Sequence, residues 1–340
     1  MGTAPSPRGL TTNGSAAMGA TMTTSAGAEA FRHLPVLATE VTELFAPVPA
    51  GLVIDATVGG GGHAAALLSS HPHLRVLGLD RDAAAVRAAR ERLRRFGDRA
   101  EVVRARFDEI AGLLDDRSDA ALVGALFDLG VSSPQLDTAD RGFSYRHDGP
   151  LDMRMDDRQT LDAATVVNTY PTEDLARLIA EYSDERYAGR VARAIERDRP
   201  ITSTKRLAEV VRDAIPVPAR REGGHPARRT FQAIRLEVNQ ELPVLTTALE
   251  AVLDRLLPGG RCVVLSYHSG EDRIAKDLFR SWSTPPRQPV GLPVEPEAPP
   301  ARLVHRGVVV PSAEDQAANP RASSARLRAL EMVTGRRGDR

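Results

Sequence analysis

The chain has 340 residues, 45 of them basic and 45 acidic, and 42% of the chain is hydrophobic. This length suits a core domain with an insertion, and no apolar run approaches a membrane span. The even charge gives no overall sign of nucleic-acid binding. The single cysteine, Cys262, excludes a disulfide framework and a cysteine-based metal site, and the eight histidines lack ligand spacing, so we expect no metal.

Residues 1–30 are rich in Gly, Ala, Ser and Thr and lack the apolar core of a signal peptide. We expect this segment to be a disordered tail. On the same grounds we expect a cytoplasmic protein without a membrane anchor. The sequence leaves the oligomeric state open, a homodimer included.

A strand-like run from residue 52 ends in four glycines, Gly59–Gly62, and His63 opens a helix. Glycine allows backbone angles denied to other residues and lets a ligand lie against bare main chain. The N–H groups at the helix start favour electron-rich ligands. A second strand ends at Asp80, about twenty residues further on, where an α/β nucleotide site holds a ribose diol. We therefore predict a cofactor that contains a nucleoside.

Two more strands are predicted, one ending near Phe107 and one at Asp128, so strands and helices alternate over residues 31–138. This alternation predicts a doubly wound parallel sheet with ligands at the carboxyl ends of its strands. Over residues 139–240 the apolar residues keep helical spacing and no strand is predicted, which indicates a helical insertion. Residues 241–340 return to the sheet domain, with a helix over 245–257, strands over 261–267 and 302–310, and a basic tail that ends as a short helix.

The glycine run also satisfies the dinucleotide pattern G-x-G-x-x-A, so a dehydrogenase is the first alternative. Three features favour S-adenosyl-L-methionine instead. Asp55 lies at the strand end, where it could reach the amino-acid part of the cofactor or simply cap the turn. Phe107 suits an adenine face, and the following Asp108 suits its amine, although we favour a helix-cap role for Asp108. The fourth strand runs into the loop from Asp128 to Gln135, which resembles the acidic-x-x-Pro loops of amino-directed methyltransferases.

Which atom of the substrate accepts the methyl group is predicted by excluding the alternatives. Methylation of a pyrimidine at carbon 5 needs a nucleophilic cysteine, and Cys262 lies in an apolar strand. Methylation of a ribose oxygen commonly uses a lysine, and the chain has two. An exocyclic amine needs only acceptors that hold its N–H groups, and Asp128 with the carbonyls around Ser132, Ser133 and Pro134 could supply them, because proline donates no hydrogen bond. We expect these four residues to be catalytic.

The insertion is basic, with thirteen arginines and lysines against five acids over residues 186–235. A solvated helix face is one reading, and an RNA or DNA phosphate patch is the reading we favour. Tyr182, Tyr187 and Phe231 could stack bases or belong to the core. A noncatalytic RNA-binding module is the second alternative function.

Several long motifs occur together in the chain. They are D-A-T-V-G-G-G-G-H, G-L-D-R-D, F-D-L-G-V-S-S-P-Q-L-D, R-G-F-S-Y, G-P-L-D-M-R-M-D, R-T-F-Q-A-I-R-L-E-V-N-Q-E-L and S-Y-H-S-G-E-D-R. In this order they resemble the ribosomal RNA small-subunit methyltransferase H family, bacterial enzymes that methylate N4 of a cytidine in 16S rRNA. The resemblance extends from His33 to about Leu330. Arg228 replaces the family's usual threonine, and Gly270 its usual leucine.

The resemblance implies a Rossmann-like class I methyltransferase domain interrupted by an all-helical domain. It also implies S-adenosyl-L-methionine as cofactor and, as target, a decoding-centre cytidine in the 16S rRNA of the small ribosomal subunit. The cofactor contacts that it implies fall on Gly61, Gly62, His63, Asp80, Phe107, Asp128 and Gln135. We also expect His268 and Asp272 to help line the pocket, and for His268 a structural role as a hydrogen-bonded histidine at a strand end is an equally favoured alternative.

Overall fold

A seven-stranded sheet forms one half of the molecule, in a computed structural model that describes Gly2 and residues 35–117, 120–221, 224–285 and 298–334. Its strand order is β3-β2-β1-β4-β5-β7-β6. The first five strands pair in parallel, whereas β7 runs antiparallel to both of its neighbours. The strands are β1 (Gly51–Asp55), β2 (Leu74–Asp80), β3 (Ala100–Arg104), β4 (Leu122–Asp128), β5 (Arg261–Ser266), β6 (Ala301–Leu303) and β7 (Arg326–Met332).

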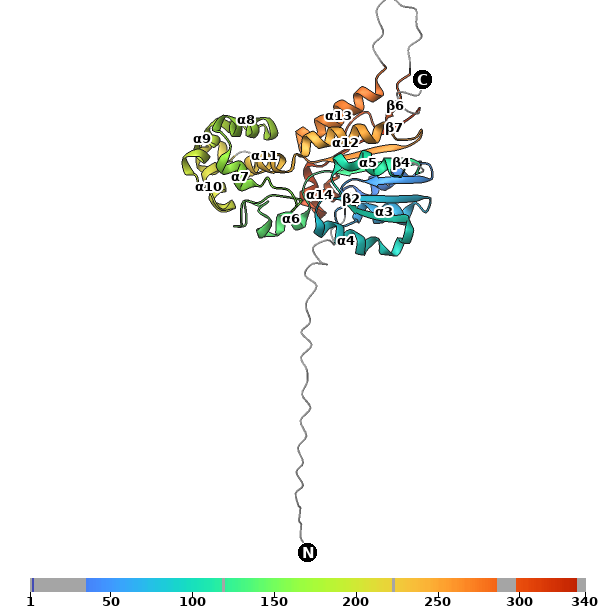
Figure 1. Cartoon of the computed structure of the whole chain (residues 1–340), viewed down its shortest axis with the longest axis horizontal. Helices are drawn as coiled ribbons and strands as arrows, with labels where there is room; N and C mark the ends of the chain where they lie inside the picture. The colour runs from blue at the N-terminus through green and yellow to red at the C-terminus, as the bar shows by residue number, and fades with distance from the viewer. Residues whose placement is uncertain (1, 3–34, 118–119, 222–223, 286–297, 335–340) are drawn as a thin grey trace, which may run out of the picture.

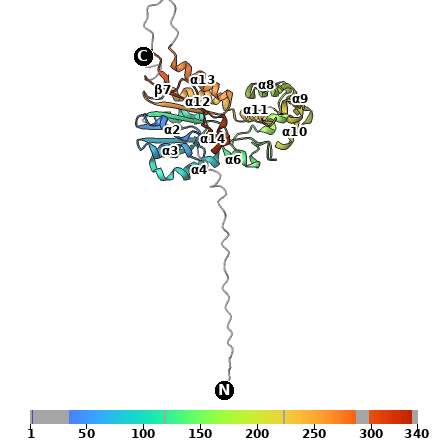
Figure 2. The same ribbon diagram turned by 180° about the vertical axis from the view of Figure 1, so that it is seen from behind.

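Helices cover both faces of the sheet (Figure 1 and Figure 2), so the central strands are buried on both sides and read as continuous apolar runs. Two hydrophobic clusters fill the layers on either side of the sheet. One layer consists of α2 (Ala38–Phe45), α3 (Gly62–Ser70) and α4 (Ala83–Leu93); the other consists of α5 (Ile110–Asp115), α12 (Glu241–Leu253) and α13 (Ser269–Ser283).

The helical insertion lies beside the carboxyl edge of the sheet as a separate lobe (Figure 1) and has its own hydrophobic cluster, from Phe143 to Val238. Ser203 caps one of its helices by accepting from the Arg206 N–H group. The helices of the insertion are α7 (Ala163–Thr169), α8 (Thr172–Ser183), α9 (Ala188–Asp198), α10 (Thr204–Ala214) and α11 (Arg228–Asn239). The α/β fold with an all-helical insertion is thus confirmed, whereas the boundaries at residues 139 and 240 stay a prediction.

The remaining elements are short. They are α6 (Ser133–Asp137), α14 (Ala313–Ala318) and the 3₁₀ turns η1 (Arg94–Arg99), η2 (Phe107–Glu109), η3 (Ala139–Arg141), η4 (Ala219–Arg221) and η5 (Pro320–Ser324). No helix in the described part of the chain is long and apolar enough to cross a membrane. The predicted disordered tail, residues 1–30, lies outside the described residues except for Gly2.

Four local predictions are wrong. The basic tail forms η5 and then strand β7, because Arg326–Met332 pairs with β5 and β6, which no local pattern reveals. The strand expected over 302–310 is reduced to β6 and a bridge at Val309. Strand β3 ends at Arg104, so Phe107 begins a 3₁₀ turn. The helix expected over 245–257 begins at Glu241, because Gln240 takes a left-handed φ of 51° and separates it from α11.

Candidate active site

A cavity of about 710 Å³ lies between the carboxyl edge of the sheet and the helical insertion. A ligand cavity at this edge is expected of an open α/β sheet, and its volume is within the range of cofactor and substrate sites. Of the residues expected to be catalytic and the cofactor contacts that the resemblance implies, all except Gly61 line it: Gly62, His63, Asp80, Phe107, Asp128, Ser132, Ser133, Pro134 and Gln135.

The glycine loop is fixed by Asp80. The Gly59 N–H group donates to Asp80 Oδ2 at 3.0 Å, and the Asp82 N–H group donates to Oδ1 at 2.8 Å. Burial raises the pKa of Asp80 to about 6, although both N–H groups favour the charged form. Each carboxylate oxygen keeps a further lone pair for a hydroxyl donor. Asp80 can therefore shape the loop and bind a diol at the same time.

Gly61 has a structural part in the loop. It precedes α3 with a left-handed φ of 76°. A Cβ placed on it would lie 3.3 Å from the Ala89 Cα atom of α4. Gly61 thus allows α3 and α4 to pack closely, and its predicted role as a direct cofactor contact stays a prediction.

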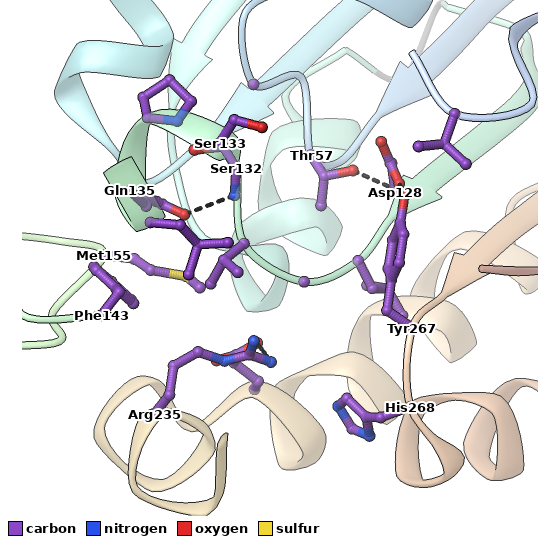
Figure 3. A pocket seen from close by; sticks show the side chains of 18 of the residues that line it. Thr57, Asp128, Ser132, Ser133, Gln135, Phe143, Met155, Arg235, Tyr267 and His268 are labelled. Atoms are coloured by element: carbon purple, nitrogen blue, oxygen red, sulfur yellow. Dashed lines mark hydrogen bonds and ion pairs between the residues drawn. The ribbon is translucent and has the colours of Figure 1, made fainter. Parts of the chain in front are cut away.

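Asp128 ends β4 on the cavity wall, where Thr57 and Tyr267 lie beside it (Figure 3) and His63 is its third neighbour. The Thr57 hydroxyl accepts from its N–H group at 2.6 Å, and the Tyr267 hydroxyl donates to Oδ1 at 2.7 Å. His63 Nε2 lies 3.5 Å from Oδ2. Burial and the Asp128 carboxylate hold the pKa of Tyr267 well above its usual value, so its hydroxyl keeps the proton. Asp128 thus offers a fixed carboxylate, a quarter exposed, to the cavity.

The loop after Asp128 leads into α6, and many of the loop's hydrogen-bonding groups are used within the first turn of this helix. Ser132 N–H donates to Gln135 Oε1 at 3.0 Å, and Gln135 Nε2 donates to Asp82 Oδ2 at 3.1 Å (Figure 3 shows the first of these bonds). The Ser132 and Pro134 carbonyls accept N–H groups of the helix. The Ser132 and Pro134 carbonyls are therefore already engaged, whereas Asp128 offers a charged acceptor to the cavity, and the catalytic role of Ser132, Ser133 and Pro134 stays a prediction.

Phe107 lines the cavity from η2, with its ring edge-on to Phe127 at 6.1 Å between centroids. Asp108 does not cap a helix; it pairs with Arg106. Asp55 accepts the Thr57 N–H group at 3.3 Å through Oδ1, as a turn-capping residue would. Burial raises the pKa of Asp55 to about 7, and among the described residues its Oδ2 has no hydrogen-bond partner.

The S-Y-H-S-G-E-D-R motif contributes differently from our expectation. His268 lines the cavity, but Asp272 does not: it pairs with Arg328 at 2.7 Å and with Arg326, both on β7. Glu271 takes the predicted place of Asp272 on the wall. The reason is that the first turn of α13 directs position 271 inward and position 272 toward β7.

Sequence reasoning missed Tyr267, Arg235 and Glu241, which also line the cavity. Tyr267 belongs to the S-Y-H-S-G-E-D-R motif, but its hydrogen bond to Asp128 joins two segments that are far apart in sequence. Arg235 of α11 pairs with Glu241 of α12 at 2.9 Å (Arg235 is labelled in Figure 3). In the sequence, Arg235 is only one of the basic residues over 186–235, and nothing in the helical spacing reveals its pairing with Glu241. Cys262, in contrast, is fully buried in β5 as predicted, and burial raises the pKa of its thiol.

Two observations suit a cationic nucleoside cofactor. The carboxylates of Asp80 and Asp128 line the cavity beside the glycine loop and His63. In addition, His63 is buried, and within the described residues its Nδ1 atom has no hydrogen-bond partner, while its Nε2 atom lies 3.5 Å from the Asp128 carboxylate. Buried polar groups without a protein partner commonly serve a ligand. The residues at the glycine loop therefore fit S-adenosyl-L-methionine, which carries a sulfonium charge.

Comparison with known proteins agrees with this geometry. The MraW methylase family matches residues 30–333. The chain is 52% identical to "Ribosomal RNA small subunit methyltransferase H" of Thermobifida fusca (strain YX) over 314 residues, which cover 90% of this chain and 94% of the relative. It is 53% identical to the protein of the same name from Salinispora arenicola (strain CNS-205), over 88% of this chain and 83% of that one. The chain belongs to the MraW methylase family, and it is a methyltransferase that uses S-adenosyl-L-methionine.

Proposed function

We propose that this protein methylates N4 of a decoding-centre cytidine in the 16S rRNA of the small ribosomal subunit. The observation that carries the proposal is the Asp128 carboxylate, held by Tyr267 and exposed to the cavity beside the glycine loop. The names of the two relatives support ribosomal RNA as the substrate class.

Gly62, His63, Asp80, Phe107 and Gln135 would hold the cofactor, with Asp80 on the ribose diol and Phe107 on the adenine. When bound, S-adenosyl-L-methionine supplies an electrophilic methyl group. The chain's own task is to place the amine in line with that group, and correct placement accounts for much of the rate of such a transfer.

Asp128 accepts a hydrogen bond from the N4 amine. The amine lone pair is delocalised into the π system of the cytosine ring, so holding the N–H groups on an acceptor favours a pyramidal nitrogen whose lone pair is localised and points at the methyl group. As the nitrogen becomes positive during transfer, the carboxylate stabilises it and takes its proton. Ser132, Ser133 and Pro134 form the adjoining wall, where proline adds no competing donor. The target base must be unstacked to reach this wall.

The positions of the cysteine and the two lysines favour an exocyclic amine as the methyl acceptor over a pyrimidine carbon or a ribose oxygen. Cys262 is not among the lining residues, so it cannot add to carbon 6 of a pyrimidine. Neither lysine of the chain, Lys205 or Lys276, lines the cavity either. An amine held by carboxylate is the acceptor that these residues suit.

The test is incubation of small subunits that lack the modification with methyl-labelled S-adenosyl-L-methionine, followed by nucleoside analysis. Label in N4-methylcytidine is the expected result. Label only in 5-methylcytidine or a 2′-O-methylated nucleoside would overturn the assignment. Asp128→Asn should lower the rate of transfer far more than it weakens cofactor binding, whereas Asp80→Ala should lose cofactor affinity itself.

A further inference from the structure

Three rings form a stack on the insertion side of the cavity. The Tyr145 ring lies parallel to the His225 ring, with 4.5 Å between centroids and 14° between planes. The Phe231 ring meets Tyr145 edge-on at 5.7 Å. All three residues line the cavity that contains Asp128. The stack thus runs from a buried ring to the open part of the site.

Burial changes steadily along the stack. Phe231 is only 3% exposed and belongs to the insertion's hydrophobic cluster, and Tyr145 packs against that cluster as a partly buried residue. His225 is exposed. Its Nδ1 atom accepts from the Ala227 N–H group at 3.2 Å, which fixes the ring orientation. The outermost ring is therefore held in place from behind while it remains accessible.

The charge around the stack is positive. The Arg146 guanidinium lies 5.9 Å from the Tyr145 ring centroid, and Arg228 lines the same part of the cavity. Both are exposed, and among the described residues neither side chain has an acidic partner. Burial, followed by the charges of Arg146 and Arg212, lowers the pKa of His225, so the ring stays neutral at neutral pH.

A neutral ring platform flanked by unpaired arginines suits single-stranded nucleic acid, because bases stack on the rings while the arginines neutralise phosphates. The target base must lie on the sheet side, at Asp128, which leaves the insertion side for another base of the same strand. Resting on the proposed function, we propose that His225 is the stacking platform for an unpaired base of the substrate RNA next to the target cytidine. Tyr145 and Phe231 are positioning residues that support it.

The probe is a nine-nucleotide single-stranded RNA with a central cytidine and 2-aminopurine on its 5′ or its 3′ side. Stacking quenches 2-aminopurine fluorescence, so one of the two probes should be quenched by the wild-type protein. His225→Ala should abolish that quenching and weaken binding about 5- to 100-fold, the range for loss of one base–aromatic stack. His225→Trp should restore both, because only a flat ring is needed.

His147→Ala is the matched control, since His147 is also exposed and lines the same cavity but lies outside the ring stack. It should leave quenching unchanged. With small subunits as substrate, His225→Ala should raise KM with little change in kcat. An unchanged KM and unchanged quenching in His225→Ala would overturn the platform.

The outcomes separate this inference from the proposed function. If wild-type protein methylates no cytidine yet quenches the probe in a His225-dependent way, the proposed function fails and the platform stands. If His225→Ala weakens binding to whole subunits but not to the probe, the partner of His225 is a ribosomal protein and the platform is wrong. Retained melting temperature and cofactor affinity in His225→Ala exclude misfolding as the cause.

Discussion

At the scale of single residues, Asp55 is a buried carboxyl group whose hydrogen bonds are incomplete. It is 1% exposed, its Oδ2 has no hydrogen-bond partner among the described residues, and its pKa is raised to about 7. A folded-state pKa above the unfolded value of 3.8 means that the folded protein binds the proton more tightly. Stability therefore falls as the pH rises between these two values, and at pH 8 the full cost of the buried charge is present.

Asp55→Asn should accordingly stabilise the cofactor-free protein at pH 8 by about 1–3 kcal/mol, because it removes a buried charge at nearly constant shape. At pH 5 the folded carboxyl is protonated while the unfolded one is still ionised, so the difference should fall to less than half of its value at pH 8. Urea unfolding of both proteins at the two pH values measures it. An equal difference at pH 5 and pH 8 would contradict the burial argument.

Tyr267 is the residue whose loss should affect chemistry without affecting binding. Tyr267→Phe removes the hydroxyl that donates to Asp128 Oδ1 but leaves the ring against Gly130. We expect kcat to fall about tenfold, as for loss of one hydrogen bond to a charged group, with cofactor affinity and KM little changed. Tyr170→Phe is the control, since its hydroxyl bonds to Glu237 in the insertion and does not line the cavity. Similar loss of kcat in both variants would show that the Asp128 bond has no special part.

At the scale of elements, the start of α3 combines a ligand loop with close helix packing. Gly61 is left-handed, and its missing side chain lets the backbone of α4 approach. Gly59 is also left-handed, with φ at 50°, but the nearest atom to a Cβ there is 3.8 Å away. Both glycines therefore have a left-handed backbone, but only at Gly61 does a neighbouring helix lie close enough to crowd a side chain.

Gly61→Ala should destabilise the protein by about 2–4 kcal/mol, from the left-handed backbone and the overpacked Ala89 contact together. Gly59→Ala should cost about 1–2 kcal/mol, from the backbone alone. Thermal and urea unfolding without cofactor measure both. A Gly59 variant as unstable as the Gly61 variant would contradict the packing role.

At the scale of the whole molecule, Asn239 ties the insertion to the sheet domain. It is buried, its Nδ2 donates to the Met153 carbonyl at 2.8 Å, and its Oδ1 accepts from Met155 N–H at 2.9 Å. Its own carbonyl accepts from Arg81 Nη1 at 2.8 Å, at the end of β2. The junction before α12 is thus a set of buried backbone groups satisfied by one side chain.

Asn239→Ala should lower the free energy of unfolding by about 2–4 kcal/mol, because it leaves two buried backbone groups without partners. Hydrogen exchange over residues 151–159 should accelerate. Asn168→Ala, which likewise frees backbone groups at Ile201, should accelerate exchange around Ile201 and leave residues 151–159 unchanged. Exchange over 151–159 that changes equally in both variants would contradict a junction role for Asn239.

Much of the site could be predicted because it lies where the chain changes from strand to loop. Asp80 and Asp128 each end an apolar strand, and parallel strands bring such ends to one edge of the sheet. The order of strands and loops in the sequence therefore predicts that these two carboxylates lie close together. Gly61 was harder to assign, since a run of glycines does not say which member faces the ligand and which faces a helix.

The sequence by itself determined the α/β fold, the helical insertion, the edge of the sheet at which the cofactor site lies, and the family. Each of these depends on local periodicity or on contiguous motifs. Only the tertiary structure decided that Tyr267 holds Asp128, that Glu271 rather than Asp272 faces the cavity, and that the basic tail is strand β7. It also brought His225 onto Tyr145 across 80 residues of sequence. Such pairings depend on how separate elements pack, and a side chain's neighbours across a core leave no periodic trace in the chain.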